Sequence, residues 1–124
     1  MNYKKYYCLF SLLCLMNLNV NAEEYNTSAN MTSEEYQSIR TASAEHMNCM
    51  NEFAITQLEH QTDPRVVTDH AMKECSPILE ELYNTLLKGN YAPEAMRRFV
   101  SSISNKSANK ILSKLMMYMA GKSQ

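Results

Sequence analysis

The stretch that decides the fold runs from Cys49 to Cys75 and reads CMNEFAITQLEHQTDPRVVTDHAMKEC. Its two cysteines lie 13 residues on either side of Thr62, and Thr62-Asp63-Pro64 is typical of a turn. Thirteen residues of helix rise about 20 Å, so antiparallel helices flanking this turn would bring the cysteines to matching heights. The spacing therefore predicts a helical hairpin closed by a Cys49–Cys75 disulfide.

Apolar side chains recur at helical spacing on both sides of the turn. Before it, Thr32 and Glu35 form a capping-box pattern that predicts the start of an amphipathic helix of roughly 26 residues. The apolar stripe of that helix comprises Tyr36, Ile39, Ala42, His46, Cys49, Met50, Phe53 and Ala54. After the turn, Asp63 and Pro64 are typical of a second helix start.

Two later residues, Pro77 and Gly89, are expected to interrupt and to end this second helix. Pro77 removes a backbone hydrogen bond and crowds the preceding turn, which predicts a kink or break at Ser76. Ser76 is then a candidate cap for a restarted helix. Gly89 is expected to end that segment in the left-handed conformation.

The remainder of the chain predicts another helical segment that starts at Pro93. Ser104, Asn105, Lys106 and Ser107 are weak helix formers, so residues 93–120 can form one helix or two, and we slightly favour a break near Asn105. The sequence has no Trp and only two Gly, and it lacks β-branched runs. We therefore expect an all-α protein, a three- or four-helix bundle built on the disulfide-stapled hairpin, with one domain over residues 32–124.

The first residues have the pattern of a secretory signal peptide. Lys4 and Lys5 precede an apolar stretch over residues 6–18 that is too short to span a bilayer, and Ala22 follows at a cleavage-site position. We expect cleavage after Ala22, a disordered polar lead-in over residues 23–31, and no membrane span in the mature chain. Because Cys8 and Cys14 leave with the signal, the remaining pair predicts an oxidising location, the periplasm or the exterior.

Charge is divided unevenly along the mature chain. Residues 23–81 hold 12 acidic and 3 basic residues, whereas residues 82–124 hold 1 acidic and 7 basic residues. The basic surface is either a solvated face or a contact for an acidic partner, and a net charge of −3 argues against nucleic acid. The candidate partner-binding residues are Arg97, Arg98, Lys106, Lys110 and Lys114.

One cluster has the residue types of a soft-metal site. His46, Met50 and His70 are candidate Cu(I) ligands, although a disulfide would remove both thiolates. The alternative is that Met50 fills the core and His46 is a hydrogen-bonded core histidine. We expect no metal and no cofactor. No nucleophile motif, zinc-protease motif or phosphate-binding loop is present in the sequence, so we also expect a protein without enzymatic activity.

The segment from Leu115 to Met119 is apolar on more than one side of a helix. It predicts a groove for a protein partner, a homodimer seam or deep burial. Asn26, Asn30 and Asn105 begin glycosylation sequons, but about two would arise by chance at this composition, so their use stays open.

The central stretch resembles a loose group of small exported helical proteins of proteobacteria. The resemblance is carried by Cys49, Ala54, Asp63, Pro64, Val67, Asp69, Ala71 and Cys75. Some similar two-cysteine proteins are periplasmic immunity proteins that neutralise peptidoglycan amidases delivered by type VI secretion. The resemblance implies a protein-binding function, but without an inhibitory loop no binding residue is carried over. Size, helicity and one disulfide are also similar to those of small periplasmic acid-stress chaperones.

Overall fold

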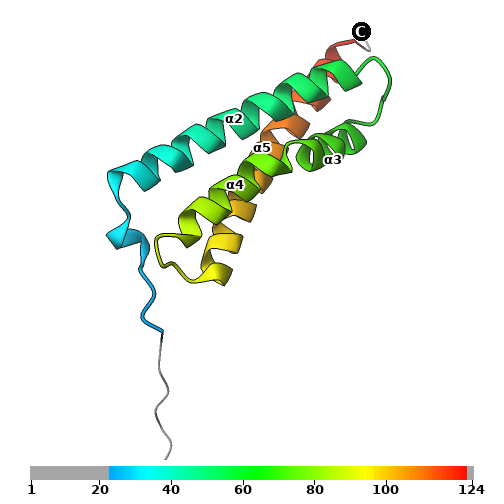
Figure 1. Cartoon of the computed structure of the whole chain (residues 1–124). Helices are drawn as coiled ribbons and strands as arrows, with labels where there is room; N and C mark the ends of the chain where they lie inside the picture. Colours follow the sequence, from blue (N-terminus) through cyan, green and yellow to red (C-terminus); the bar gives the residue numbers. More distant parts are fainter. Residues whose placement is uncertain (1–22, 123–124) are drawn as a thin grey trace, which may run out of the picture.

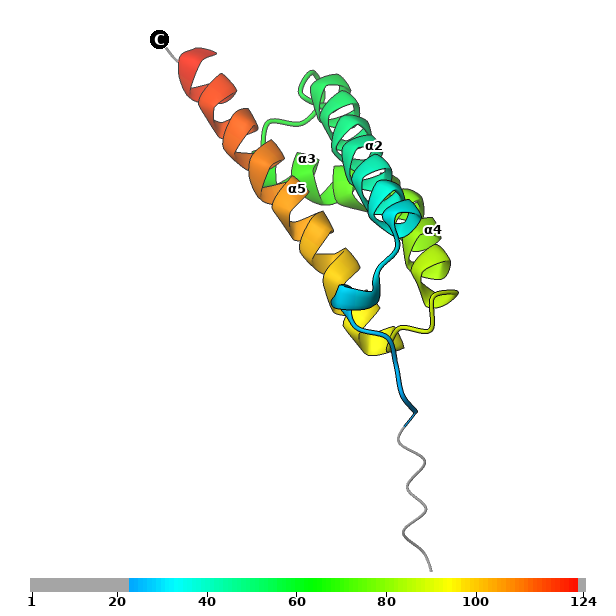
Figure 2. The ribbon, with the colours of Figure 1, turned by 90° about the vertical axis from the view of Figure 1, so that its left-hand side faces the viewer.

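The computed structural model describes residues 23–122, and in that part of the chain four α-helices pack as a bundle (Figure 1). They are α2 (Ser33–Gln57), α3 (Pro64–Glu74), α4 (Ser76–Leu87) and α5 (Pro93–Lys122), and a short 3-10 helix, η3 (Ser28–Asn30), precedes them. α2 and α5 run in the same direction, while α3 and α4 follow one another back along the bundle (Figures 1 and 2). The prediction of an all-α bundle is confirmed.

The signal peptide expected over residues 1–22 lies outside the described residues. Within residues 23–122, none of the helices combines the length and the apolar character that crossing a bilayer requires.

The predicted capping box at the start of α2 is confirmed. The backbone N–H of Glu35 donates to Thr32 Oγ1 over 3.1 Å, and the backbone N–H of Thr32 donates to Glu35 Oε2 over 2.7 Å. The Tyr91 hydroxyl also donates to Glu35 Oε2, over 2.9 Å. The Thr32 bond, and then the Tyr91 bond, lower the pKa of Glu35 below its ordinary value. This carboxylate therefore ties the start of α2 to the loop before α5.

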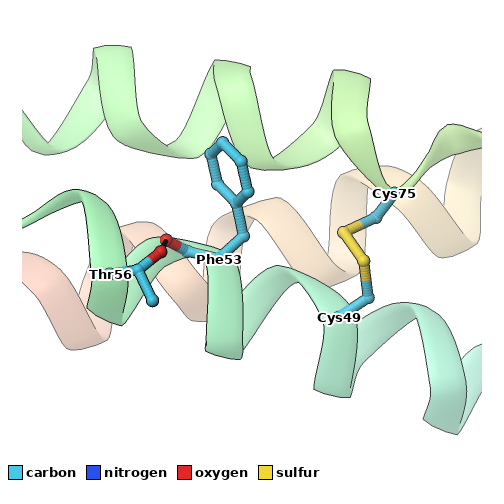
Figure 3. The surroundings of a disulfide bond; sticks show 4 residues. All are labelled: Cys49, Phe53, Thr56 and Cys75. Atoms are coloured by element: carbon cyan, nitrogen blue, oxygen red, sulfur yellow. Dashed lines mark hydrogen bonds between the residues drawn. A yellow bond between two sulfur atoms is a disulfide. The ribbon is translucent and has the colours of Figure 1, made fainter.

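The disulfide joins α2 to the junction between α3 and α4 (Figure 3). Cys49 and Cys75 have their Cα atoms 5.9 Å apart, as the hairpin prediction requires. Phe53, one turn further along α2, extends from the same helix toward α3 (Figure 3). The disulfide is thus flanked by an aromatic side chain that packs against the apolar cluster to which Cys75 belongs.

The helix break predicted from Pro77 is confirmed, but the predicted cap is wrong. α3 ends at Glu74 and α4 begins at Ser76, with Cys75 between them at φ −93° and ψ 0°. Ser76 lies inside α4 and its hydroxyl donates to Glu80 Oε1 over 3.0 Å. Cys75 therefore occupies the position before the helix, where the disulfide fixes it.

The left-handed residue after α4 is Asn90, with φ 56°, and not Gly89 as expected. Asparagine tolerates this conformation because its short side chain can bond to nearby backbone. Here the Asn90 Nδ2 group donates to the carbonyl oxygen of Glu24 over 3.2 Å. The residue that ends the turn thereby also holds the lead-in segment.

The expectation of disorder over residues 23–31 is wrong for most of this segment. Asn26 forms a β-bridge with Tyr91, and its backbone N–H donates to the Asn90 carbonyl oxygen over 2.9 Å. Its side chain donates to the Gly89 carbonyl oxygen over 2.7 Å. These partners are backbone groups more than sixty residues away, so the polar composition of the segment did not reveal them.

Gly89 is required for a steric reason, and this leads to a stability prediction. A Cβ atom at this position would overlap the Glu35 carboxylate and lie 2.5 Å from the Tyr91 ring. We expect Gly89→Ala to lower the free energy of unfolding by about 1–3 kcal/mol, as overpacking does. Urea unfolding would measure the change. The matched control is Gly121→Ala, where an added Cβ meets nothing within 4 Å. Equal stability of the two variants would contradict the steric reading.

The break favoured near Asn105 is wrong, because α5 is continuous over 30 residues. Ser107 and Ala108 are buried, and α5 packs against α2, α3 and α4. Tertiary packing of this kind overrides weak helix propensity. Of the four weak helix formers, Ser107 is the one that lies in the interior of the bundle.

The interior divides into two apolar clusters that meet near the helix break. The disulfide-side core lies between α2, α3 and α5 and the loop-side core lies mainly between α4 and the start of α5, with partly buried side chains of α2 packed against it. The buried members of the disulfide-side core are Met50, Ala54, Val67, Ala71, Cys75, Ala108, Ile111 and Leu115. Those of the loop-side core are Leu79, Leu82, Leu86, Tyr91 and Met96.

Candidate functional site

The three candidate metal ligands do not converge on one point. His46 and Met50 are completely buried, whereas His70 is exposed on α3. Among residues 23–122, no group of three or more His, Cys, Asp or Glu side chains is arranged to hold a metal ion. The Cys49 and Cys75 sulfur atoms are bonded to one another. The described residues therefore assemble no soft-metal site from these candidates.

His46 is the most unusual buried side chain in the described part of the protein. Its exposed fraction is 0%, and neither Nδ1 nor Nε2 has a hydrogen-bond partner. The expectation of a hydrogen-bonded core histidine is therefore wrong. Burial lowers the pKa of His46, because a charged imidazolium would lose its hydration without gaining a partner.

His46 marks a polar layer between the two cores. On α2 it lies between Ala42, which packs on the loop-side core, and Met50, which belongs to the disulfide-side core. On α5 the buried Ser107 lies in the same way between Ile103 and Ala108. The interior is thus least apolar at the height where α3 ends and α4 begins.

The five basic residues predicted to bind a partner lie in different surroundings along α5. Arg97 and Arg98 lie 4.0 Å and 3.9 Å from Glu94 carboxylate oxygens, in exposed pairs of little energetic weight. Lys106 and Lys110 are exposed in the middle of the helix. Lys114 reaches across to α2, where its Nζ donates to Asn51 Oδ1 over 2.7 Å. Of the five, Lys114 alone lines a groove between the C-terminal halves of α2 and α5.

A groove of about 440 Å³ runs between the C-terminal halves of α2 and α5. Its floor includes the buried side chains of Ala54, Ile111 and Leu115. The remaining lining residues are Asn51, Ile55, Leu58, Glu59, Lys114, Tyr118 and Lys122. The Lys122 ammonium lies 4.8 Å from the centre of the Tyr118 ring, a cation–π contact that places a charge at the end of the groove.

Exposed apolar side chains lie on the same C-terminal parts of α2 and α5 that form this groove. We call Ile55, Met116, Met117 and Tyr118 the apolar end; their exposed fractions are 56%, 54%, 68% and 50%. Ile55 and Tyr118 line the groove, whereas Met116 and Met117 do not. The segment from Leu115 to Met119 was predicted to be a groove, a seam or a buried segment, and only Leu115 of the residues just named is deeply buried.

The α2 wall of the groove was missed from the sequence. Ile55 stands outside the apolar stripe that predicts the core face of α2, and this out-of-phase position was the signal that could have identified it. Asn51 and Glu59 carry no recognisable motif. Their role depends on α5 lying alongside α2, which no local pattern specifies.

Comparison of the chain with protein-family models, curated proteins and solved structures finds no match. The groove, the apolar end and the buried histidine are therefore the observations on which a function can be proposed.

Proposed function

We propose that this protein is an exported, non-enzymatic protein-interaction module of the periplasm or the exterior. The observation that carries the proposal is the apolar end, whose four exposed apolar side chains include two, Ile55 and Tyr118, that line the groove. Isolated exposed apolar residues are ordinary, but a cluster beside a groove is typical of a contact surface. The Cys49–Cys75 disulfide supports an oxidising location.

Toxin immunity is the most concrete form of this proposal. Its support is the resemblance of the Cys49–Cys75 hairpin to small exported proteins that include amidase immunity proteins. A compact, stapled helical domain would serve such a role by binding a toxin tightly and covering its active site. A toxin encoded beside this gene would be the first protein to test, and protection of cells against it would be the readout.

A variant of the apolar end provides the binding test. We expect Met117→Asp to reduce capture of the partner from oxidised envelope extract at least tenfold, because a carboxylate in an apolar contact loses its hydration. Capture by the immobilised mature protein, quantified by mass spectrometry, would measure it. Thr41→Asp places the same charge on an exposed residue of α2 some 21 Å from Ile55 and should leave capture unchanged. Equal capture by both variants, or no specific partner, would contradict the proposal.

The buried His46 favours a second candidate, an acid-activated chaperone. Protonation of an imidazole that has no partner inside the bundle would open the interior and expose apolar surface. Such a protein would suppress aggregation of unfolded clients in acid, below the ordinary histidine pKa of about 6.5, and not at neutral pH. The variant His46→Leu would retain its closed structure in acid and lose this activity. Activity that is independent of residue 46 would remove the support for this candidate.

A further inference from the structure

The two walls of the groove carry opposite charge at matching heights. The bond between Lys114 and Asn51 fixes one level across the groove. Because α2 and α5 run in the same direction, one further turn along each helix advances both sides of the groove by the same distance. Four residues on, Ile55 and Tyr118 lie at similar heights. Four more lead to Glu59, in the turn that follows α2, and to Lys122, the last residue of α5, and all four side chains line the groove.

We propose that a second copy of this chain occupies the groove, with a two-fold axis parallel to α2 and α5. Such an axis lays α2 of each copy over α5 of the other without changing heights along the helices. Ile55 of one copy then meets Tyr118 of the partner copy, and Glu59 meets Lys122 of the partner copy. The inference deepens the proposed function, because it names a partner for the same end of the molecule.

Charge decides between the ways in which two copies can face each other. A two-fold axis across the helices, at the height of Tyr118, would instead lay α5 over α5 in the opposite direction, which brings Lys114 of one copy toward Lys122 of the other. Like charges facing each other across an interface oppose association. The parallel axis pairs the acidic α2 wall with the basic α5 wall twice. It also covers Ile55 and Tyr118, which are each at least half exposed in the single chain.

The groove is short, so the expected dimer is weak. An interface restricted to the last turns of two helices falls in the class of small, transient contacts, with a dissociation constant on the order of micromolar or weaker. Met116 and Met117 do not line the groove. They remain available to a different protein when two copies are paired.

Sedimentation equilibrium of the processed, oxidised protein tests the inference through a charge exchange. The weight-average mass should rise from one copy to two over roughly 10 µM to 1 mM. Glu59→Lys and Lys122→Glu, made singly, each place like charges across the two-fold axis and should weaken the dimer at least tenfold. The double variant restores the opposite pairing and should recover most of the affinity. Lys106→Glu and Glu81→Lys, at exposed residues that do not line the groove, are the matched controls.

A cysteine pair tests the direction of the axis. When chains carrying Ile55→Cys are mixed with chains carrying Tyr118→Cys, mixed disulfide dimers should form in preference to dimers of either variant alone. Preferential pairing of Tyr118→Cys with itself would indicate the crossed axis and overturn the inference. A monomer at all concentrations, or a dimer unaffected by either single charge reversal, would also overturn it.

The proposed function and the dimer inference can be contradicted independently of each other. If the protein stays monomeric while an envelope protein still binds through the apolar end, the dimer inference falls and the proposed function stands. If the dimer forms as described but Met117→Asp leaves capture unchanged, the inference stands and the proposed function falls.

Discussion

Removal of the Cys49–Cys75 disulfide should lower the free energy of unfolding by about 3.5 kcal/mol. The two cysteines are separated by 26 residues, and opening a loop of this size restores conformational freedom to the unfolded chain. Domains of this size are typically stable by about 5–15 kcal/mol, so the loss is a large fraction of the total. Urea unfolding of the Cys49→Ala/Cys75→Ala double variant would measure it.

Chemical reduction supplies the control for this prediction. The reduced natural chain keeps both cysteine side chains, including Cys75, which is 1% exposed. The loss of stability on reduction therefore measures the effect of breaking the disulfide, without the effect of the small cavities that two alanines create. The reductant should leave the double variant unchanged. A loss below about 1 kcal/mol on reduction would show that the unfolded chain gains little freedom and would overturn the prediction.

The second large effect should appear in acid, through His46. The pKa of His46 is lowered in the folded protein. Below about pH 6.5 the imidazole therefore becomes protonated in the unfolded chain while it stays neutral in the folded chain. The free energy of unfolding should then fall by about 1.4 kcal/mol per pH unit, until the pH reaches the folded-state pKa of His46. The lowered pKa of Glu35 adds a further loss in a more acidic range, below the ordinary pKa of a carboxyl group.

A substitution at residue 46 should isolate this effect. His46→Leu removes the group that titrates, so the decline that begins below about pH 6.5 should largely disappear. At pH 7.5 the same variant should be more stable by about 1–3 kcal/mol, since a buried N–H without a partner is lost. His70→Gln, at an exposed position, is the control and should retain the full decline. Identical pH profiles for the natural chain and His46→Leu would rule out this explanation.

The parts of the fold that were predicted from sequence are those encoded by local patterns. The Thr32 cap, the Asp63-Pro64 turn and the break before Pro77 each depend on a few neighbouring residues. The disulfide followed from them, because a hairpin with equal arms leaves the two cysteines facing each other. Local chemistry was therefore sufficient for the hairpin.

The parts that were missed depend on contacts between distant segments. Asn90 takes the left-handed position where glycine was expected, and its side chain bonds to the backbone at Glu24. The continuity of α5 through Asn105 depends on packing against three other helices. The α2 wall of the groove exists only because α5 lies beside it. Sequence patterns identify the faces of single helices, whereas a site between two helices requires their alignment.

The polar layer has a consequence for that alignment. If α2 slid along α5 by one turn, about 5.4 Å, His46 would move into the aliphatic side chains of one core and Ser107 would lose its place between the two. Apolar interiors alone tolerate such shifts, whereas a single buried polar position can specify one register, as it does in coiled coils. In this bundle, a buried histidine without a hydrogen-bond partner would then select a single register for α2 and α5.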